Sequence, residues 1–143
     1  MDSELADLAE AILGVGRELR MALSADVIHL TAQEAHVMRH IDHHPGVTPS
    51  DVARATGLQR SNLSTALRAL ERRGFVERRA DPHDARGVNL FPTALAADNL
   101  KRLRRQWAKQ MKSALGGEVN NAAAAKVLLE RIEAALVAER QGG

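Results

Sequence analysis

The stretch that decides the fold is "TPSDVARATGLQRSNLSTALRALERRGFVERR", which runs from position 48 to position 79. Its first part predicts a short helix. Thr48 can cap that helix, Pro49 suits its first position, and Asp51 favours its positive end. Gly57 ends the helix, and a second one follows after "LQ". Two short helices joined by a tight turn that contains glycine predict a helix-turn-helix.

The second helix, 60–73, is predicted to bury one face and to expose the other. At about 100° per residue, Leu63, Leu67 and Leu70 fall on one side and form the buried face. The helix start, the opposite side and its flanks are polar, with no acid near their centre: Gln59, Arg60, Ser61, Asn62, Ser64, Thr65, Arg68 and Arg72. In the major groove, Asn reads adenine, Arg reads guanine, and Ser or Thr reads either, and the same groups hold phosphates. This face predicts a recognition helix for double-stranded DNA.

The loop "ADPHDARGVN", 80–89, lies between two β-prone runs, "FVERRA" and "GVNLF", so we expect a β-hairpin here. A hairpin that follows a recognition helix is a wing, and an Arg at its tip can enter the minor groove or hold its phosphates. Arg86 is the expected contact. Asp84 precedes it by two residues, so its carboxylate is expected to accept from the guanidinium and orient it. Arg78 and Arg79 add positive charge at the hairpin base.

A further helix precedes the helix-turn-helix. Thr31 and Glu34 form a T-x-x-E capping box, so this helix is expected to start at Thr31. Pro45 and Gly46 are expected to end it.

Three more helices are expected over 4–23, 92–115 and 119–139, each with an apolar stripe at helical spacing. Pro92 is expected to open the second of them. A winged module of about 60 residues is too small to cover all three stripes. The simplest solution is an all-α core shared by two copies of the chain.

Composition supports a mostly helical, DNA-binding domain. Ala and Leu are abundant and Tyr and Cys are absent, which favours helices and excludes disulfides and thiolate metal sites. Residues 1–51 hold three basic and nine acidic side chains, residues 52–86 hold eight Arg against four acids, and residues 87–112 hold six Lys or Arg against one Asp. This asymmetry suggests a polyanion partner. No run approaches the length of a membrane span and no signal peptide is evident, so a cytoplasmic protein is expected.

The sequence resembles the MarR family of winged helix-turn-helix transcription regulators. The likeness rests on "LTAQEAHVMRHI" at 30–41, on the stretch at 48–79, and above all on "DPHDARGVNL" at 81–90, which matches the wing signature D-x-x-D-x-R. It covers nearly the whole chain and implies one domain over 1–143, with a DNA-binding module at 31–91 and dimerisation helices at 4–30 and 92–143. The family's wing usually ends "LT-x-x-G". Here Leu90 is followed by Phe91-Pro92-Thr93-Ala94, so the usual Thr cap of the next helix is expected to be lost.

The resemblance implies a homodimer on a palindromic operator, and many family members are repressors that small ligands release. No cofactor and no metal are implied. The predicted DNA-binding residues are Thr48, Gln59, Arg60, Ser61, Asn62, Ser64, Thr65, Arg68, Arg72, Arg78, Arg79, Asp84 and Arg86.

Two other readings stay open. His36 and His40 are four residues apart on one helix face, which is a metal-ligand spacing, so a zinc-sensing regulator could use a cluster made of His29, His36, His40, His43 and His44. The chain could also be a winged-helix adaptor that binds proteins in place of DNA. An enzyme is not expected, because the sequence lacks a Gly-rich phosphate loop, G-x-S-x-G and H-E-x-x-H.

Overall fold

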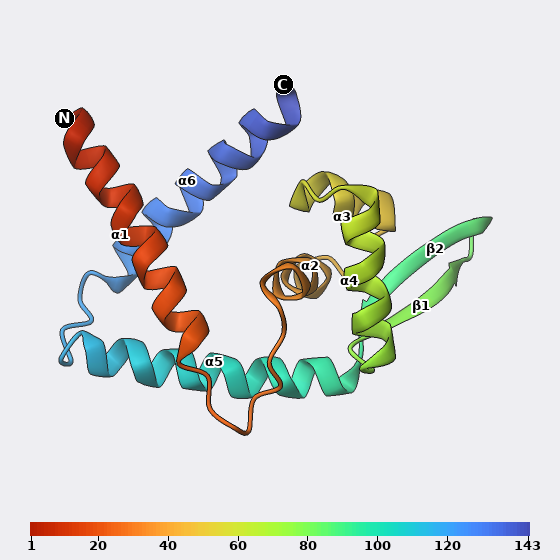
Figure 1. Ribbon diagram of the computed structural model, residues 1–143, viewed down its shortest axis with the longest axis horizontal. Helices are drawn as coiled ribbons and strands as arrows, with labels where there is room; N and C mark the ends of the chain where they lie inside the picture. The colour runs from red at the N-terminus through yellow and green to blue at the C-terminus, as the bar shows by residue number, and fades with distance from the viewer. The chain divides into compact units, whose positions relative to one another are not determined.

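The computed structural model describes residues 1–143 and contains six helices and one antiparallel hairpin (Figure 1). In chain order these are α1 (Asp2–Met21), α2 (Ala32–His43), α3 (Pro49–Thr56), α4 (Arg60–Arg72), β1 (Val76–Asp81), β2 (Asp84–Pro92), α5 (Ala94–Ala114) and α6 (Ala122–Gly142). The chain forms two compact units, one of residues 1–29 and 99–117 and one of residues 30–98 and 118–143. The predicted mostly α, winged helix-turn-helix fold is confirmed.

The larger unit is built on a core shared by α2, α3, α4 and the base of the hairpin. Its fully buried side chains are Val37, Ile41, Val52, Leu70, Phe75 and Leu90. Leu63 and Leu67 of α4 are also buried, as the helical periodicity predicted. Because α3 and α4 share this core through Val52 and Leu63, the two helices of the helix-turn-helix are held against each other by apolar burial.

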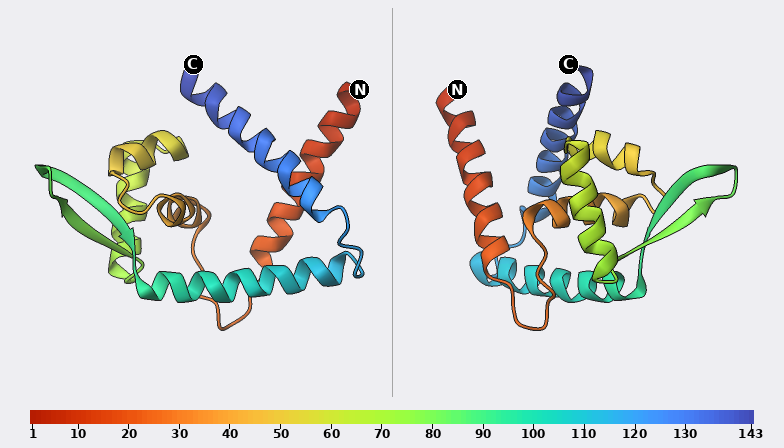
Figure 2. Two further views of the ribbon diagram at one scale, coloured as in Figure 1. Left: turned by 180° about the vertical axis from the view of Figure 1, so that it is seen from behind. Right: turned by 45° about the vertical axis from the view of Figure 1, so that its right-hand side comes forward.

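The hairpin pairs β1 with β2 from Val76 opposite Pro92 to Ala80 opposite Val88, and the register shifts between Ala80 and Asp81. Both views in Figure 2 show the hairpin projecting beyond α3 and α4. A feature that the sequence did not predict joins β2 to the α2–α3 turn, where Val47 forms a bridge with Leu90 through an N–H···O bond of 2.8 Å.

The predicted ends of the central helices are confirmed. Thr31 and Glu34 make both hydrogen bonds of the capping box at the start of α2. The Thr48 hydroxyl accepts from the Asp51 N–H at 3.2 Å at the start of α3. Gly57 ends α3 with a φ of 71°, a left-handed conformation that favours glycine.

The start of α5 differs from the expectation in two ways. Pro92 ends β2, where a missing N–H is tolerated, so it does not open the helix, which begins at Ala94. The expected loss of the Thr cap is also wrong. The Thr93 hydroxyl accepts from the Ala96 N–H at 3.2 Å and donates to the Gly74 carbonyl at 2.5 Å. One side chain therefore caps α5 and fixes it to the turn after α4.

The smaller unit joins the loop after α1 to α5. The Asn99 side chain accepts from the Ile28 N–H at 2.8 Å and donates to the Ile28 carbonyl at 3.2 Å. Gln110 donates to the Ala22 carbonyl at 2.8 Å. Helix α1 itself buries no residue, and its apolar stripe is exposed: Leu5, Leu8, Ile12 and Val15. None of the helices combines the length and the apolar character that crossing a membrane requires.

Candidate nucleic-acid interface

Helix α4 presents a polar face, as the sequence predicted. Ser61, Asn62, Ser64 and Arg68 are exposed, while Leu63, Ala66, Leu67 and Leu70 on the opposite side are buried. The Arg68 guanidinium makes no ion pair within the chain, and neither does that of Arg60 or Arg72. Hydroxyl, amide and guanidinium groups without intramolecular partners lose no internal bond when they meet a ligand.

Three side chains that were predicted to contact DNA already interact with neighbouring groups of the protein. The Arg78 guanidinium forms an ion pair with Glu71 of α4. The Arg79 guanidinium lies over the Phe91 ring, 4.2 Å from its centroid, and 3.4 Å from a Glu77 carboxylate oxygen. The Thr48 hydroxyl is the cap of α3. These side chains support the shape of the module, so they would have to exchange partners before they could contact a duplex.

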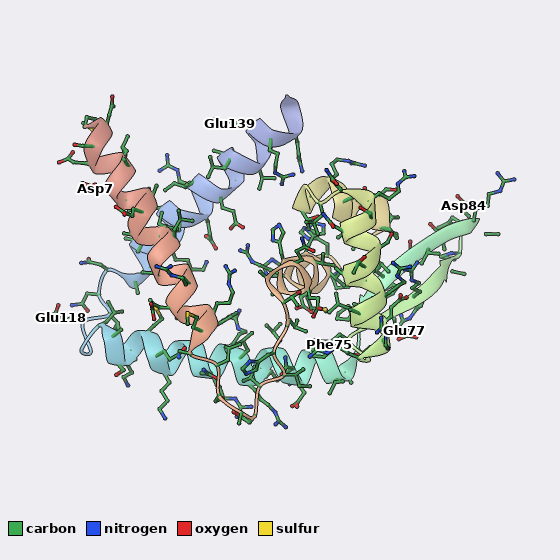
Figure 3. All side chains as sticks on the ribbon, in the orientation of Figure 1. Asp7, Phe75, Glu77, Asp84, Glu118 and Glu139 are labelled. Atoms are coloured by element: carbon green, nitrogen blue, oxygen red, sulfur yellow. The ribbon has the colours of Figure 1, made fainter.

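The wing tip is exposed and strongly polar. Figure 3 shows Asp84 near the outer end of the hairpin, while Glu77 and Phe75 lie near its base. The Asp84 carboxylate accepts from the Arg86 backbone N–H at 2.9 Å, and the Asp81 carboxylate accepts from the His83 N–H at 2.8 Å. The sequence predicted a bond from Asp84 to the guanidinium of Arg86, whereas the bond in the structure is to its peptide. Asp84 therefore shapes the loop that carries Arg86.

Sequence reasoning missed a set of side chains that join α6 to the winged module. Arg39 of α2 pairs with Glu133 of α6 through both guanidinium nitrogens, and the second of these bonds is 3.0 Å long. Arg140 of α6 donates to the carbonyls of Arg54 and Ala55 at the end of α3. Partners separated by 85 to 94 positions leave no local pattern that could have revealed them.

The histidines considered as an alternative metal site do not gather into a ligand set. His40 and His44 stack with ring centroids 4.4 Å apart, and His43 lies 6.5 Å from His44. No three His, Asp or Glu side chains of the chain are arranged to hold a metal ion. Burial, followed by the neighbouring charge of His44, holds the pKa of His40 below its usual value. The stacking brings His40 and His44 into contact at the end of α2.

Asp42, beside these histidines, is expected to make stability depend on pH. Burial raises the pKa of its carboxyl to about 6. A carboxyl whose pKa is higher in the folded state favours folding while it is protonated, and this contribution is lost as pH rises from about 4 through 6. Asp42→Asn should therefore raise the free energy of unfolding by about 1 kcal/mol at pH 7.5, allowing for solvent screening of a half-buried group.

Urea unfolding of both proteins measures this difference. The gain should shrink as pH falls and approach zero below about pH 3, where the parent carboxyl is protonated in both states. An equal gain at both pH values would mean that the amide acts by packing and that Asp42 is ionised normally.

Comparison with known proteins agrees with this geometry. Residues 30–87 match a model of the MarR family. The chain is similar to the solved structure of the transcriptional repressor CouR bound to a 23-mer DNA duplex, at 25% identity with a TM-score of 0.70, covering 91% of this chain and 89% of that one. A search of curated protein sequences gives no match.

Two other solved structures show the same fold at lower identity. The PcaV transcriptional regulator from Streptomyces coelicolor, in complex with its natural ligand, is 24% identical with a TM-score of 0.62 and 89% of each chain covered. A mutant of MepR from a multidrug resistant S. aureus clinical isolate is 18% identical with a TM-score of 0.69, covering 95% of this chain and 97% of that one. The matched module contains α2 to the wing, and the similarity extends over the helices on either side. Residues 30–87 therefore match the MarR family, and the chain as a whole is similar in fold to solved transcriptional regulators.

Proposed function

We propose that this protein is a homodimeric repressor that acts in the cytoplasm, where it binds a palindromic operator in double-stranded DNA and is released by a small ligand. The observation that carries the proposal is the exposed face of α4, where Asn62 and Arg68 stand without intramolecular partners above a buried leucine side. These are groups that read base edges in the major groove. The similarity to CouR, solved on a DNA duplex, supports the same use of the fold.

Exposed apolar surface supports the dimer. Leu5 of α1 is 58% exposed and Leu136 of α6 is 60% exposed, and both belong to helices that bury no residue within the chain. Contiguous apolar stripes of this kind are covered in stable proteins by a partner. A second copy also doubles the DNA surface contacted, because each copy supplies one recognition helix to one half-site.

Selection of bound duplexes from a random pool tests DNA recognition directly. The expected result is an enriched inverted repeat with half-site centres about 10 base pairs apart, or a multiple of one helical turn. A reporter gene with that sequence across its promoter should then be transcribed less when the protein is present. A chain that binds no duplex even at low salt would favour the adaptor alternative.

Release by a ligand is supported by the similarity to PcaV, which was solved with its natural ligand. A ligand that weakens DNA binding must favour a conformation with lower operator affinity. Metabolites that raise the melting temperature of the protein can be tested for their ability to displace a labelled operator. Release would be refuted for a ligand that binds the protein and the protein–operator complex equally well.

Two substitutions of Asp84 in the wing are expected to change DNA affinity in opposite directions. Asp84→Asn retains an oxygen that can accept from the Arg86 N–H and removes one negative charge, so DNA binding should strengthen a few-fold. Asp84→Ala removes the same charge and also the bond that shapes the loop, so binding should weaken. Titration of a labelled operator at fixed salt measures both variants.

Arg86→Ala is the companion variant for the wing. It should weaken binding to operator and unrelated duplex alike, and it should reduce the slope of log affinity against log salt by about one unit per wing. If Asp84→Ala binds as tightly as Asp84→Asn, the loop bond is irrelevant to binding and only the charge matters.

A further inference from the structure

The last turn of α6 lies on the carbonyl end of α3, the first helix of the helix-turn-helix. Arg140 donates from Nη1 to the Arg54 carbonyl at 3.2 Å and from Nη2 to the Ala55 carbonyl at 2.6 Å. Gln141 donates to the Arg54 carbonyl at 3.2 Å. The last carbonyls of a helix have no partner within it, and this end carries the negative pole of the helix dipole. Arg140 therefore completes the C-terminus of α3 with a charge of the favourable sign.

A second contact lies two turns earlier on the same side of α6. Glu133 accepts from both Nη atoms of Arg39 on α2, a paired geometry that fixes direction as well as distance. The hydrogen bond from Arg39 holds the pKa of Glu133 below its usual range. Since Glu133 and Arg140 are seven residues apart, they project from one helix face to α2 and α3.

Gly57 has two reasons to be glycine, and Arg140 supplies the second. Its φ of 71° lies in the left-handed region, which Asn also tolerates. A Cβ at this position would lie 2.5 Å from Nη1 and 3.0 Å from Cζ of Arg140. Any side chain at position 57 would therefore displace the guanidinium from the end of α3.

We propose that Arg140 and Glu133 are positioning residues for DNA recognition. They hold α3 in place, and α3 in turn fixes the orientation in which α4 presents its polar face to DNA. Val52 of α3 and Leu63 of α4 belong to the same hydrophobic core. A shift in the position of α3 should therefore also shift α4, the proposed recognition helix. The role rests on the proposed function, because its readout is operator affinity. The contacts themselves are properties of the protein alone.

Operator titration of single variants gives the first test. Arg140→Ala should weaken binding about 10-fold, since two bonds to a charged donor are lost. Arg140→Lys should give an intermediate loss, because an ammonium cannot reproduce the two-pronged contact. Arg131→Ala is the matched control: Arg131 is exposed, lies on the opposite face of α6 and has no partner in the chain, so its loss should change affinity less than two-fold.

Charge exchange tests the second contact. Arg39→Glu and Glu133→Arg should each weaken operator binding, and the double variant, which restores an ion pair of reversed polarity, should recover most of the loss. A general effect on folding would show no such rescue. Binding is measured well below the melting temperature of every variant, so that only folded protein is compared.

A double-mutant cycle tests the close contact between the Arg140 guanidinium and Gly57 in the absence of DNA. Gly57→Asn should lower the melting temperature in the parent by more than it does in the Arg140→Ala background, where no guanidinium has to move. Equal shifts in both backgrounds, or an Arg140→Ala variant with parental operator affinity, would overturn the positioning role. A parent chain that binds no duplex would overturn the proposed function, and the positioning role with it.

Discussion

Arg68→Ala should produce the largest loss of operator binding, about 2–6 kcal/mol for the dimer. A bidentate contact between an Arg and a base edge is worth about 1–3 kcal/mol, and a homodimer makes it twice on a palindrome. Arg68 is exposed near the centre of the polar face of α4 and makes no ion pair, so its removal should not disturb the fold. Titration of operator and unrelated duplex at the same salt concentration measures the effect.

The discriminating result is the ratio of the two affinities. Arg68→Ala should bind unrelated duplex only slightly less tightly than the parent, so the ratio should fall and the preference at one position per half-site should relax. Arg131→Ala, which removes the same charge from α6, should leave the ratio unchanged. Equal losses on both duplexes would make Arg68 a phosphate contact.

Placing charge in the stripe of α1 should separate the dimer and weaken operator binding at least 100-fold. Leu5 and Ile12 lie on the exposed apolar stripe, so Leu5→Glu with Ile12→Glu would bury two carboxylates in the proposed interface. A single copy reaches one half-site and loses the high effective concentration that links the two sites. Sedimentation gives the oligomeric state and titration gives the affinity.

A double variant that adds the same two charges elsewhere on α1 is the control. Ser3 and Ala6 lie off the apolar stripe, so Ser3→Glu with Ala6→Glu should leave a dimer of parental affinity. If the stripe variant remains dimeric, α1 is not part of the interface and the stripe has another role.

The winged module could be predicted from the sequence because the signals that specify its helices are local. The capping box at Thr31, the Gly57 stop and the leucine period of α4 each act within one or two turns, and each is seen in the structure. Local signals could not show which arginine side chains form ion pairs within the chain and which do not. Arg78 is paired because Glu71 faces it in space, while Arg68 has no such neighbour.

Other features escaped prediction because they depend on long-range packing or on a choice between two donors. The bond from Arg39 to Glu133 joins positions 94 apart, and the bridge from Val47 to Leu90 joins a turn to a strand. At the wing, spacing placed Asp84 beside Arg86, but spacing cannot decide between a backbone and a side-chain donor.

A hydrogen bond of Thr65 on α4, the proposed recognition helix, affects which modified bases the protein should accept. Thr65 donates its hydroxyl proton to the Ser61 carbonyl at 3.0 Å. With that proton committed, Thr65 has no donor for N7 or O6 of guanine, and it can offer a bound groove only its methyl group and an oxygen lone pair. A methyl group suits the 5-methyl of thymine, and 5-methylcytosine carries the same substituent. Selected sites should therefore hold thymine at one position of each half-site, and cytosine methylation there should substitute for it.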